Sequence, residues 1–266
     1  NKIEWVATQH ACFAYGYIPV PIYDTFGLEN ISYIINHANI KIVFVVSTKL
    51  KELLKLRNEL VKQIVVFDNE EHPYVESDFS DLLKGLDCTI TRWDDVIKIK
   101  DRYPHIPPTY NTPAAIMYTS GTTGPPKGCI ITHGNFIGAA SSYIKVYPFN
   151  ESDTLLSFLP LAHSYEEVLH FVAIHSKAKI AFYSGSVSRL IEEVGILHPS
   201  LFVSVARVFE RIYDGMQKKI AKKPFLTRLA FNTAFSIKSF LTNHFGIQHV
   251  PLLDNVFDAI NTQAVG

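Results

Sequence analysis

The segment from Tyr118 to Gly128 reads YTSGTTGPPKG and concentrates residue types that can bind an anion. Its glycines permit backbone angles that let successive N–H groups converge on one ligand, because a residue without a Cβ tolerates these angles and a close approach. Hydroxyl side chains add donors and a lysine adds a positive charge, so several hydrogen bonds of about 1.5 to 3 kcal/mol each could reach phosphate oxygens. The predicted polyphosphate-binding residues are Thr119, Ser120, Gly121, Thr122, Thr123, Gly124 and Lys127.

This loop does not follow the Walker pattern GxxxxGK[ST], because Lys127 follows Pro126 and Gly124 is followed by two prolines. A P-loop NTPase is therefore disfavoured. A surface loop rich in turn-forming residues is the alternative, which the long run of fitting positions makes the weaker one.

Composition narrows the class of protein. The chain has 266 residues, 25 basic and 25 acidic side chains and 47% hydrophobic residues. It can bury a sizeable core, and nucleic acid is not its expected partner. Three widely spaced cysteines without a CxxC pair indicate neither a disulfide framework nor a cysteine zinc site, and favour a reducing, intracellular setting. The chain begins with Asn1, so we expect a fragment.

The elements that must position this loop follow from hydrophobic periodicity. Apolar runs of strand length alternate with helix-like stretches in the first part of the chain, which predicts parallel βαβ units. The predicted strands are 19–23, 41–46 and 63–67, and the predicted helices are 3–15, 28–38 and 48–60. Residues 69–113 mix charges with prolines, and we predict a junction there with one short helix near 78–86.

After residue 114 the alternation resumes around the loop. We predict strands up to Tyr118 and at 128–132, 154–158, 179–183 and 201–205, with helices at 134–146, from about His163, at 206–222 and at 225–245. The predicted division is a first α/β lobe with its junction at 1–110 and a lobe with the phosphate loop and C-terminal helices at 111–266.

Four segments resemble one enzyme superfamily. YTSGTTGPPKG followed by ITHGNF resembles the signature loop of the adenylate-forming enzymes, which activate carboxylic acids as acyl-AMP with ATP. FLPLAHSYEE at 158–167, FAYGYIPVPIYDTFG at 13–27 and LHPSLFVSVARVFERIYD at 197–214 are similar to segments of the long-chain acyl-CoA synthetase branch. The resemblance implies an α/β fold of layered, mostly parallel sheets flanked by helices, here an incomplete N-terminal domain of the acetyl-CoA synthetase-like fold.

The resemblance also implies residue roles. The loop would hold the β and γ phosphates of ATP while the substrate carboxylate attacks the α phosphorus, so that catalysis is positional and electrostatic. Lys127 and His163 are the implied catalytic residues, and His163, Ser164, Glu166 and Glu167 the implied substrate-binding residues. Glu167 stands where the branch commonly has arginine, and Gly134 where the superfamily often has arginine.

Plainer interpretations of these residues stay open. His163 could simply cap a helix, and both glutamates could be solvated helix residues. The eleven histidines include no HExxH or HxxxH pair, so we predict no metal site in this chain. Four lysines between 218 and 223 border an apolar helix, which leaves peripheral membrane contact open beside the favoured alternative that the helix packs on its own domain.

The function implied is conversion of a long-chain fatty acid, ATP and CoA to acyl-CoA, AMP and pyrophosphate, in the cytoplasm or peripherally on the cytosolic face of intracellular membranes. The superfamily's Mg²⁺-binding glutamate, its ribose-binding aspartate and its small C-terminal domain do not occur in this sequence, so we expect the chain alone to be inactive. Two alternatives remain: a fatty acyl-AMP ligase or other adenylate-forming enzyme, and a non-catalytic nucleotide- or lipid-binding module.

Overall fold

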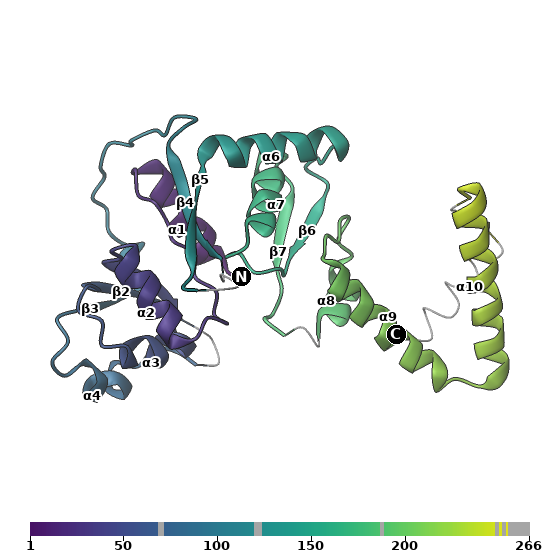
Figure 1. The fold of residues 1–266 in the computed structure, drawn as a ribbon, viewed down its shortest axis with the longest axis horizontal. Coiled ribbons are helices and arrows are strands. Elements are labelled where there is room, and N and C mark those ends of the chain that lie inside the picture. The colour runs from purple at the N-terminus through teal and green to yellow at the C-terminus, as the bar shows by residue number, and fades with distance from the viewer. Residues whose placement is uncertain (69–71, 120–123, 187–188, 248–249, 252–253, 255–266) are drawn as a thin grey trace. The chain divides into compact units, whose positions relative to one another are not determined.

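The computed structural model describes residues 1–68, 72–119, 124–186, 189–247, 250–251 and 254 (Figure 1). The chain divides into two compact units. The first unit comprises residues 1–152 and 157–182, and the second comprises 153–156 and 183–266. The first unit therefore contains residues of both lobes predicted from the sequence, and the division at residue 110 stays a prediction.

The first unit opens with a parallel α/β arrangement. Its elements are α1 (Ile3–Ala14), α2 (Leu28–His37), β1 (Ile42–Val46), α3 (Ser47–Lys55), β2 (Gln63–Phe67) and β3 (Thr89–Arg92). The sheet has the order β1-β2-β3, and all neighbours are parallel, with Ile42 opposite Gln63 and Gln63 opposite Thr89. The predicted βαβ pattern is confirmed here, because strands at this spacing pair in parallel through crossover helices.

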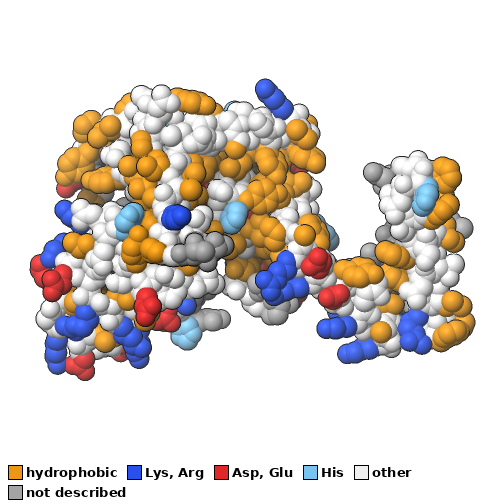
Figure 2. Space-filling model, viewed as in Figure 1, with side chains coloured by type: hydrophobic (Ala, Val, Ile, Leu, Met, Phe, Trp, Pro, Cys, Tyr) orange, Lys and Arg blue, Asp and Glu red, His pale blue; other side chains and the backbone are white. Residues whose placement is uncertain are grey.

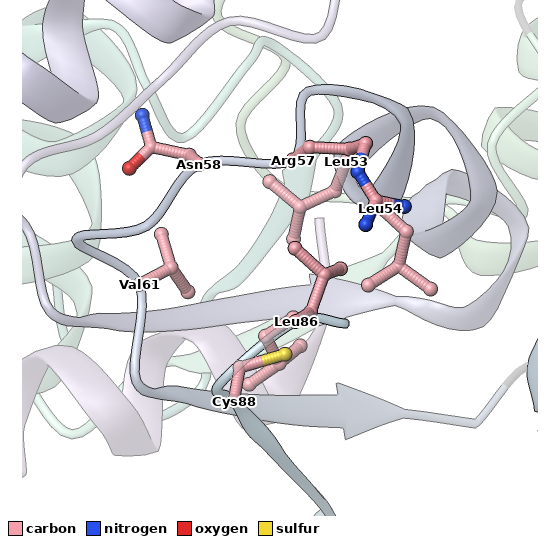
Figure 3. A pocket seen from close by; sticks show the side chains of 8 residues that line it. Leu53, Leu54, Arg57, Asn58, Val61, Leu86 and Cys88 are labelled. Carbon is pink, nitrogen blue, oxygen red and sulfur yellow. The ribbon is translucent and has the colours of Figure 1, made fainter. Parts of the chain in front are cut away.

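A hydrophobic cluster holds this sheet to its helices. Its buried members are Ile35, Leu50, Leu54, Val61, Ile64 and Val66. Beside the cluster lies a pocket of about 20 Å³ lined partly by Leu53, Leu86 and Cys88 (Figure 3). A volume of this size holds about one water molecule, so the pocket is no candidate for a nucleotide or fatty acid.

The junction contains more regular structure than the sequence predicts. A short helix near 78–86 is confirmed as η1 (Glu76–Phe79) followed by α4 (Ser80–Leu83). Strand β3 and helix α5 (Trp93–Val96) were not predicted. Both are only four residues long, too short for hydrophobic periodicity to reveal them.

An antiparallel hairpin carries the glycine-rich segment. Strands β4 (Pro113–Thr119) and β5 (Lys127–Thr132) pair with Tyr118 opposite Gly128 and Thr119 opposite Lys127. Strand β4 is mostly buried, whereas β5 is exposed over most of its length. Helix α6 (His133–Val146) follows directly, and Thr132 caps it through a reciprocal capping box with Asn135.

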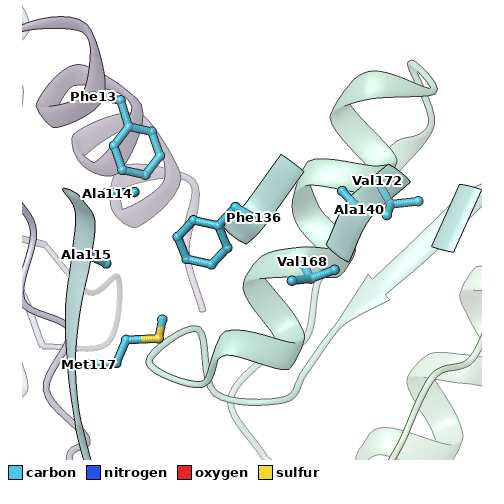
Figure 4. Close-up of a cluster of buried hydrophobic side chains, with 8 residues drawn as sticks. All are labelled: Phe13, Ala114, Ala115, Met117, Phe136, Ala140, Val168 and Val172. Atoms are coloured by element: carbon cyan, nitrogen blue, oxygen red, sulfur yellow. The ribbon is translucent and has the colours of Figure 1, made fainter. Parts of the chain in front are cut away.

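The core of the first unit joins segments that lie far apart in the sequence. Helix α7 (Ser164–His175) packs against α6, and β7 (Lys179–Phe182) follows it. Side chains from α1, β4, α6 and α7 turn toward one interior (Figure 4). The buried members of this cluster are Phe13, Ala114, Ala115, Met117, Phe136, Ala140, Val168 and Val172.

The second unit is mainly helical. It contains most of β6 (Thr154–Ser157), then α8 (Leu190–Leu197), α9 (Ala206–Ala221) and α10 (Phe225–Phe245). The two long helices confirm their prediction, and hydrophobic and basic side chains lie on their surfaces (Figure 2). None of the helices in the described part of the chain is long and apolar enough to span a bilayer.

Two predicted strands are wrong. Residues 19–23 form no strand, because Pro19 and Pro21 lack the N–H that a ladder needs; one carbonyl, that of Pro19, accepts from Ile116 N at 3.1 Å. Residues 202–205 also form no strand, and Leu201 makes only an isolated parallel bridge with Leu155. An apolar run becomes a strand only where a partner strand is available to it.

Candidate active site

The hairpin brings the two ends of the predicted phosphate loop together. Thr119 ends β4 and Lys127 begins β5, and the two residues are opposite each other in the antiparallel register. Both are exposed, as is Gly124, where an added Cβ would meet no atom within 4 Å. The predicted ligands Ser120, Gly121, Thr122 and Thr123 lie outside the described residues. A hydroxyl and an ammonium group thus flank the segment on which polyphosphate binding was predicted.

The stem of this hairpin contains a contact that the sequence does not indicate. The buried Tyr118 places its hydroxyl 2.6 Å from Nδ1 of His37, the last residue of α2. Burial raises the pKa of the Tyr118 phenol, so at neutral pH the phenol keeps its proton and can donate it to an unprotonated His37 Nδ1. These residues are 81 positions apart, and no local pattern predicts a contact at that separation.

His163 lies at the N-terminus of α7 and caps it. Its Nδ1 accepts a hydrogen bond from the backbone N–H of Tyr165 at 3.1 Å. The interpretation of His163 as a helix cap is therefore confirmed. Acceptance at Nδ1 places the proton of a neutral ring on Nε2, and the residue is exposed, as is the neighbouring Ser164. A capped His163 still has one N–H to offer to an anionic oxygen.

Glu166 and Glu167 are not solvated helix residues, because each is only 1% exposed. The carboxylate oxygen Oε1 of Glu166 lies 3.6 Å from His170 Nε2, and that nitrogen lies 2.8 Å from the hydroxyl of Ser157. Both glutamates therefore belong to the interior of the first unit. Neither presents a carboxylate to solvent, and their role in substrate binding stays a prediction.

Glu167 is the more unusual of the two. Burial raises its pKa to about 8, and the amide of Gln9 on α1 opposes this rise in part. Among the described residues, however, no hydrogen bond of good geometry reaches either Glu167 oxygen or Gln9 Nε2. The raised pKa favours the protonated, neutral form of the Glu167 carboxyl at pH 7.

Comparison with known proteins shows the family. A family model described as AMP-binding enzyme matches residues 1–242. The chain belongs to the AMP-binding enzyme family. It is 37% identical over 272 residues to fatty acyl-CoA synthetase B of Dictyostelium discoideum, covering 98% of this chain and 38% of that protein. It is also 37% identical over 229 residues to long-chain-fatty-acid–CoA ligase 1 of Homo sapiens, covering 80% of this chain and 32% of the relative.

Solved structures with a similar fold include an adenylation domain and a CoA synthetase. The adenylation domain of a carboxylate reductase from Mycobacterium chelonae matches 98% of this chain and 44% of its own, with 16% identity and a TM-score of 0.76. An o-succinylbenzoate CoA synthetase from Bacillus subtilis matches 80% and 49%, with 18% identity and a TM-score of 0.58. At these identities the likeness supports the fold alone, which confirms the predicted α/β class.

The packing around Gly134 leaves no room for a side chain. A Cβ at this position would lie 2.4 Å from the ring of Tyr110, whose carbonyl accepts from Gly134 N at 2.8 Å. The aromatic ring thus occupies the space that a side chain at residue 134 would need.

In the part of the chain that the structure describes, no group of three or more His, Cys, Asp or Glu residues could hold a metal ion.

Proposed function

We propose that this chain is part of an enzyme that activates long-chain fatty acids. In the first step a carboxylate oxygen of the fatty acid bonds to the α phosphorus of ATP and pyrophosphate leaves, which forms acyl-AMP. In the second step the thiol of CoA attacks the acyl carbon and AMP leaves. The single observation that carries this proposal is the Thr119-to-Lys127 loop in an AMP-binding chain whose relatives are named long-chain acyl-CoA synthetases.

The hairpin supports the first step by position and charge. Lys127 and Thr119 lie opposite each other at its end, where they could hold the β and γ phosphates while the α phosphorus stays open to attack. Stabilising the charge that develops on departing pyrophosphate is electrostatic catalysis, and it needs no protein nucleophile. His163 would donate its Nε2–H to an oxygen of the carboxylate or adenylate as charge moves between them.

Mg²⁺ is the cofactor expected to accompany ATP. The described residues contain no cluster of His, Cys, Asp or Glu side chains that fits it. When bound, the ion would neutralise phosphate charge.

The cytosolic location proposed above is supported by the three free cysteines, Cys12, Cys88 and Cys129.

The test is fatty-acid-dependent exchange of pyrophosphate into ATP by the full-length protein. The wild type should catalyse exchange with a long-chain acid, and a Lys127→Ala, Thr123→Ala double variant should lose about a hundredfold or more. The exposed Lys145→Ala on α6 is the control and should retain full exchange. Unchanged exchange in the double variant would remove the role given to the loop.

The acyl acceptor needs a separate measurement. With acyl-AMP formed, addition of CoA should release AMP and yield acyl-CoA. Transfer to a carrier protein but not to CoA would instead identify a fatty acyl-AMP ligase. If none of the carboxylic acids tested supports exchange while ATP binding is retained, the protein would be a non-catalytic nucleotide-binding module.

A further inference from the structure

We propose that His37 and Tyr118 are positioning residues for the phosphate loop. In this inference His37 on α2 accepts a hydrogen bond from the Tyr118 hydroxyl and so fixes where Thr119 and Lys127 lie. The inference deepens the proposed function and rests on it for its kinetic consequence. Its structural part, the anchoring of the hairpin end, stands on contacts within the first unit.

The hydrogen bond is short and lies next to the loop. The Tyr118 oxygen is 2.6 Å from His37 Nδ1, and the two rings meet edge to face with centroids 5.8 Å apart. Tyr118 immediately precedes Thr119 and is opposite Gly128, which immediately follows Lys127. A displacement of Tyr118 would therefore move both residues that end the loop.

Gly128 makes room for this arrangement. A Cβ at residue 128 would lie 2.9 Å from Ile116 Cγ2 and 3.2 Å from Tyr118 Cζ. The Tyr118 ring thus lies against the backbone of its cross-strand partner, and its hydroxyl extends to α2. A side chain at residue 128 would push the ring from this position, because contacts below about 3.4 Å are repulsive.

His37 is itself held from the other side. Its ring stacks on that of Tyr33, one helical turn earlier, with centroids 5.3 Å apart and an interplanar angle of 18°. The neighbouring Ile35 is buried in the core of the parallel sheet. Helix α2 therefore connects a packed core to the hairpin, whose second strand β5 is largely exposed and gains little support from its own burial.

This anchoring is what a loop that binds phosphate by position requires. Catalysis that depends on placed donors loses rate and affinity when the donors shift, even though no ligand contact is removed. One hydrogen bond of this kind corresponds to a factor of about 5 to 10 in an equilibrium. We therefore expect a change of that size in the KM for ATP, with no change in the KM for the fatty acid.

The experiment compares four variants of the full-length protein in pyrophosphate exchange. Tyr118→Phe removes the donor and His37→Leu removes the acceptor, so each should raise the KM for ATP about 5- to 10-fold. His37→Asn keeps an acceptor at the δ position of the side chain and should restore a near-normal KM. Tyr33→Phe removes a phenol hydroxyl outside this bond and should leave both KM values unchanged.

Amide hydrogen exchange supplies a readout that does not depend on the reaction. Peptides containing Tyr118–Thr119 and Lys127–Gly128 should exchange faster in Tyr118→Phe and His37→Leu than in His37→Asn or the wild type. A KM for ATP within twofold of the wild type in both disrupting variants, or unchanged exchange in these peptides, would overturn the inference. If the wild type shows no pyrophosphate exchange, the proposed function fails, and the amide measurement alone decides the anchoring.

Discussion

Glu167 carries the largest electrostatic cost that the described residues show. Its carboxyl is 1% exposed and lies in the first turn of α7. Its charge also raises the pKa of Tyr23, which burial raises first. A carboxylate without a cation or a set of donors is expensive to bury, so the acid takes up a proton in the folded protein.

The consequence is a stability that falls as pH rises. The folded pKa of about 8 lies above the ordinary value of 4.5, so the stability present below pH 4.5 is lost progressively as pH rises toward 8. A difference of this size is on the order of 5 kcal/mol. The glutamine of Glu167→Gln cannot ionise. The free energy of unfolding of this variant, relative to that of the wild type, should therefore rise by about 2 to 4 kcal/mol between pH 5 and pH 8.5.

Urea unfolding at the two pH values checks this expectation. The exposed Glu29→Gln on α2 is the matched control and should change the free energy of unfolding by less than about 0.5 kcal/mol at either pH. An equal effect of Glu167→Gln at pH 5 and pH 8.5 would mean that the carboxyl is ionised at both and has a partner.

At the scale of elements, the β4–β5 hairpin needs Gly128 because the neighbouring side chains leave no room for a Cβ at this position. Gly128→Ala would place a methyl 2.9 Å from Ile116 Cγ2 and against the held ring of Tyr118. We expect this substitution to lower the free energy of unfolding by about 1 to 3 kcal/mol. Thermal unfolding with hydrogen exchange of the hairpin peptides measures both the loss and its location.

Gly138→Ala on α6 is the control for that prediction. An added Cβ at this exposed helical position meets nothing within 4 Å. Alanine there should stabilise the helix by about 0.5 to 1 kcal/mol, because glycine is the poorer helix former. The two substitutions add the same methyl group and should act with opposite sign; loss of stability in both would point to a general intolerance of alanine.

Sequence patterns predict most of the elements that position the site. Strands β1 and β2 have the predicted cores, and α1, α6, α9 and α10 begin and end within two residues of expectation. Hydrophobic periodicity fails to predict a strand correctly where pairing with a neighbouring strand decides whether the strand forms. Residues 19–23 form no strand because their prolines have no N–H to donate, whereas β3 is a strand because β2 lies beside it.

The site is less predictable than the elements, because side-chain environment depends on distant segments. The predicted loop ends, Thr119 and Lys127, meet as antiparallel pairing requires. The burial of Glu166 and Glu167 is not visible in the sequence, since charged residues in a first helical turn normally face solvent. The bond between Tyr118 and His37 is equally hidden, because it joins α2 to a strand that follows much later.

At the scale of the whole molecule, we expect the helices and strands that share the core of the first unit to unfold cooperatively. Phe136 on α6 is buried and lies 4.9 Å, between ring centroids, from Phe171 on α7. The same cluster includes Phe13 of α1 and Ala114 of β4. Segments separated by more than a hundred residues thus share one core, so a cavity in it should weaken all of them together.

Phe136→Ala tests this cooperativity against Ile137→Ala, its neighbour on the same helix, which is 58% exposed. The buried substitution should cost about 3 to 5 kcal/mol and the exposed one less than about 0.5 kcal/mol. Hydrogen exchange in low urea should show faster opening of α1, β4, α6 and α7 in Phe136→Ala, and unchanged opening of α9 and α10. Faster exchange confined to α6 would contradict a shared core, whereas equal acceleration of α9 and α10 would show that the two compact units unfold as one.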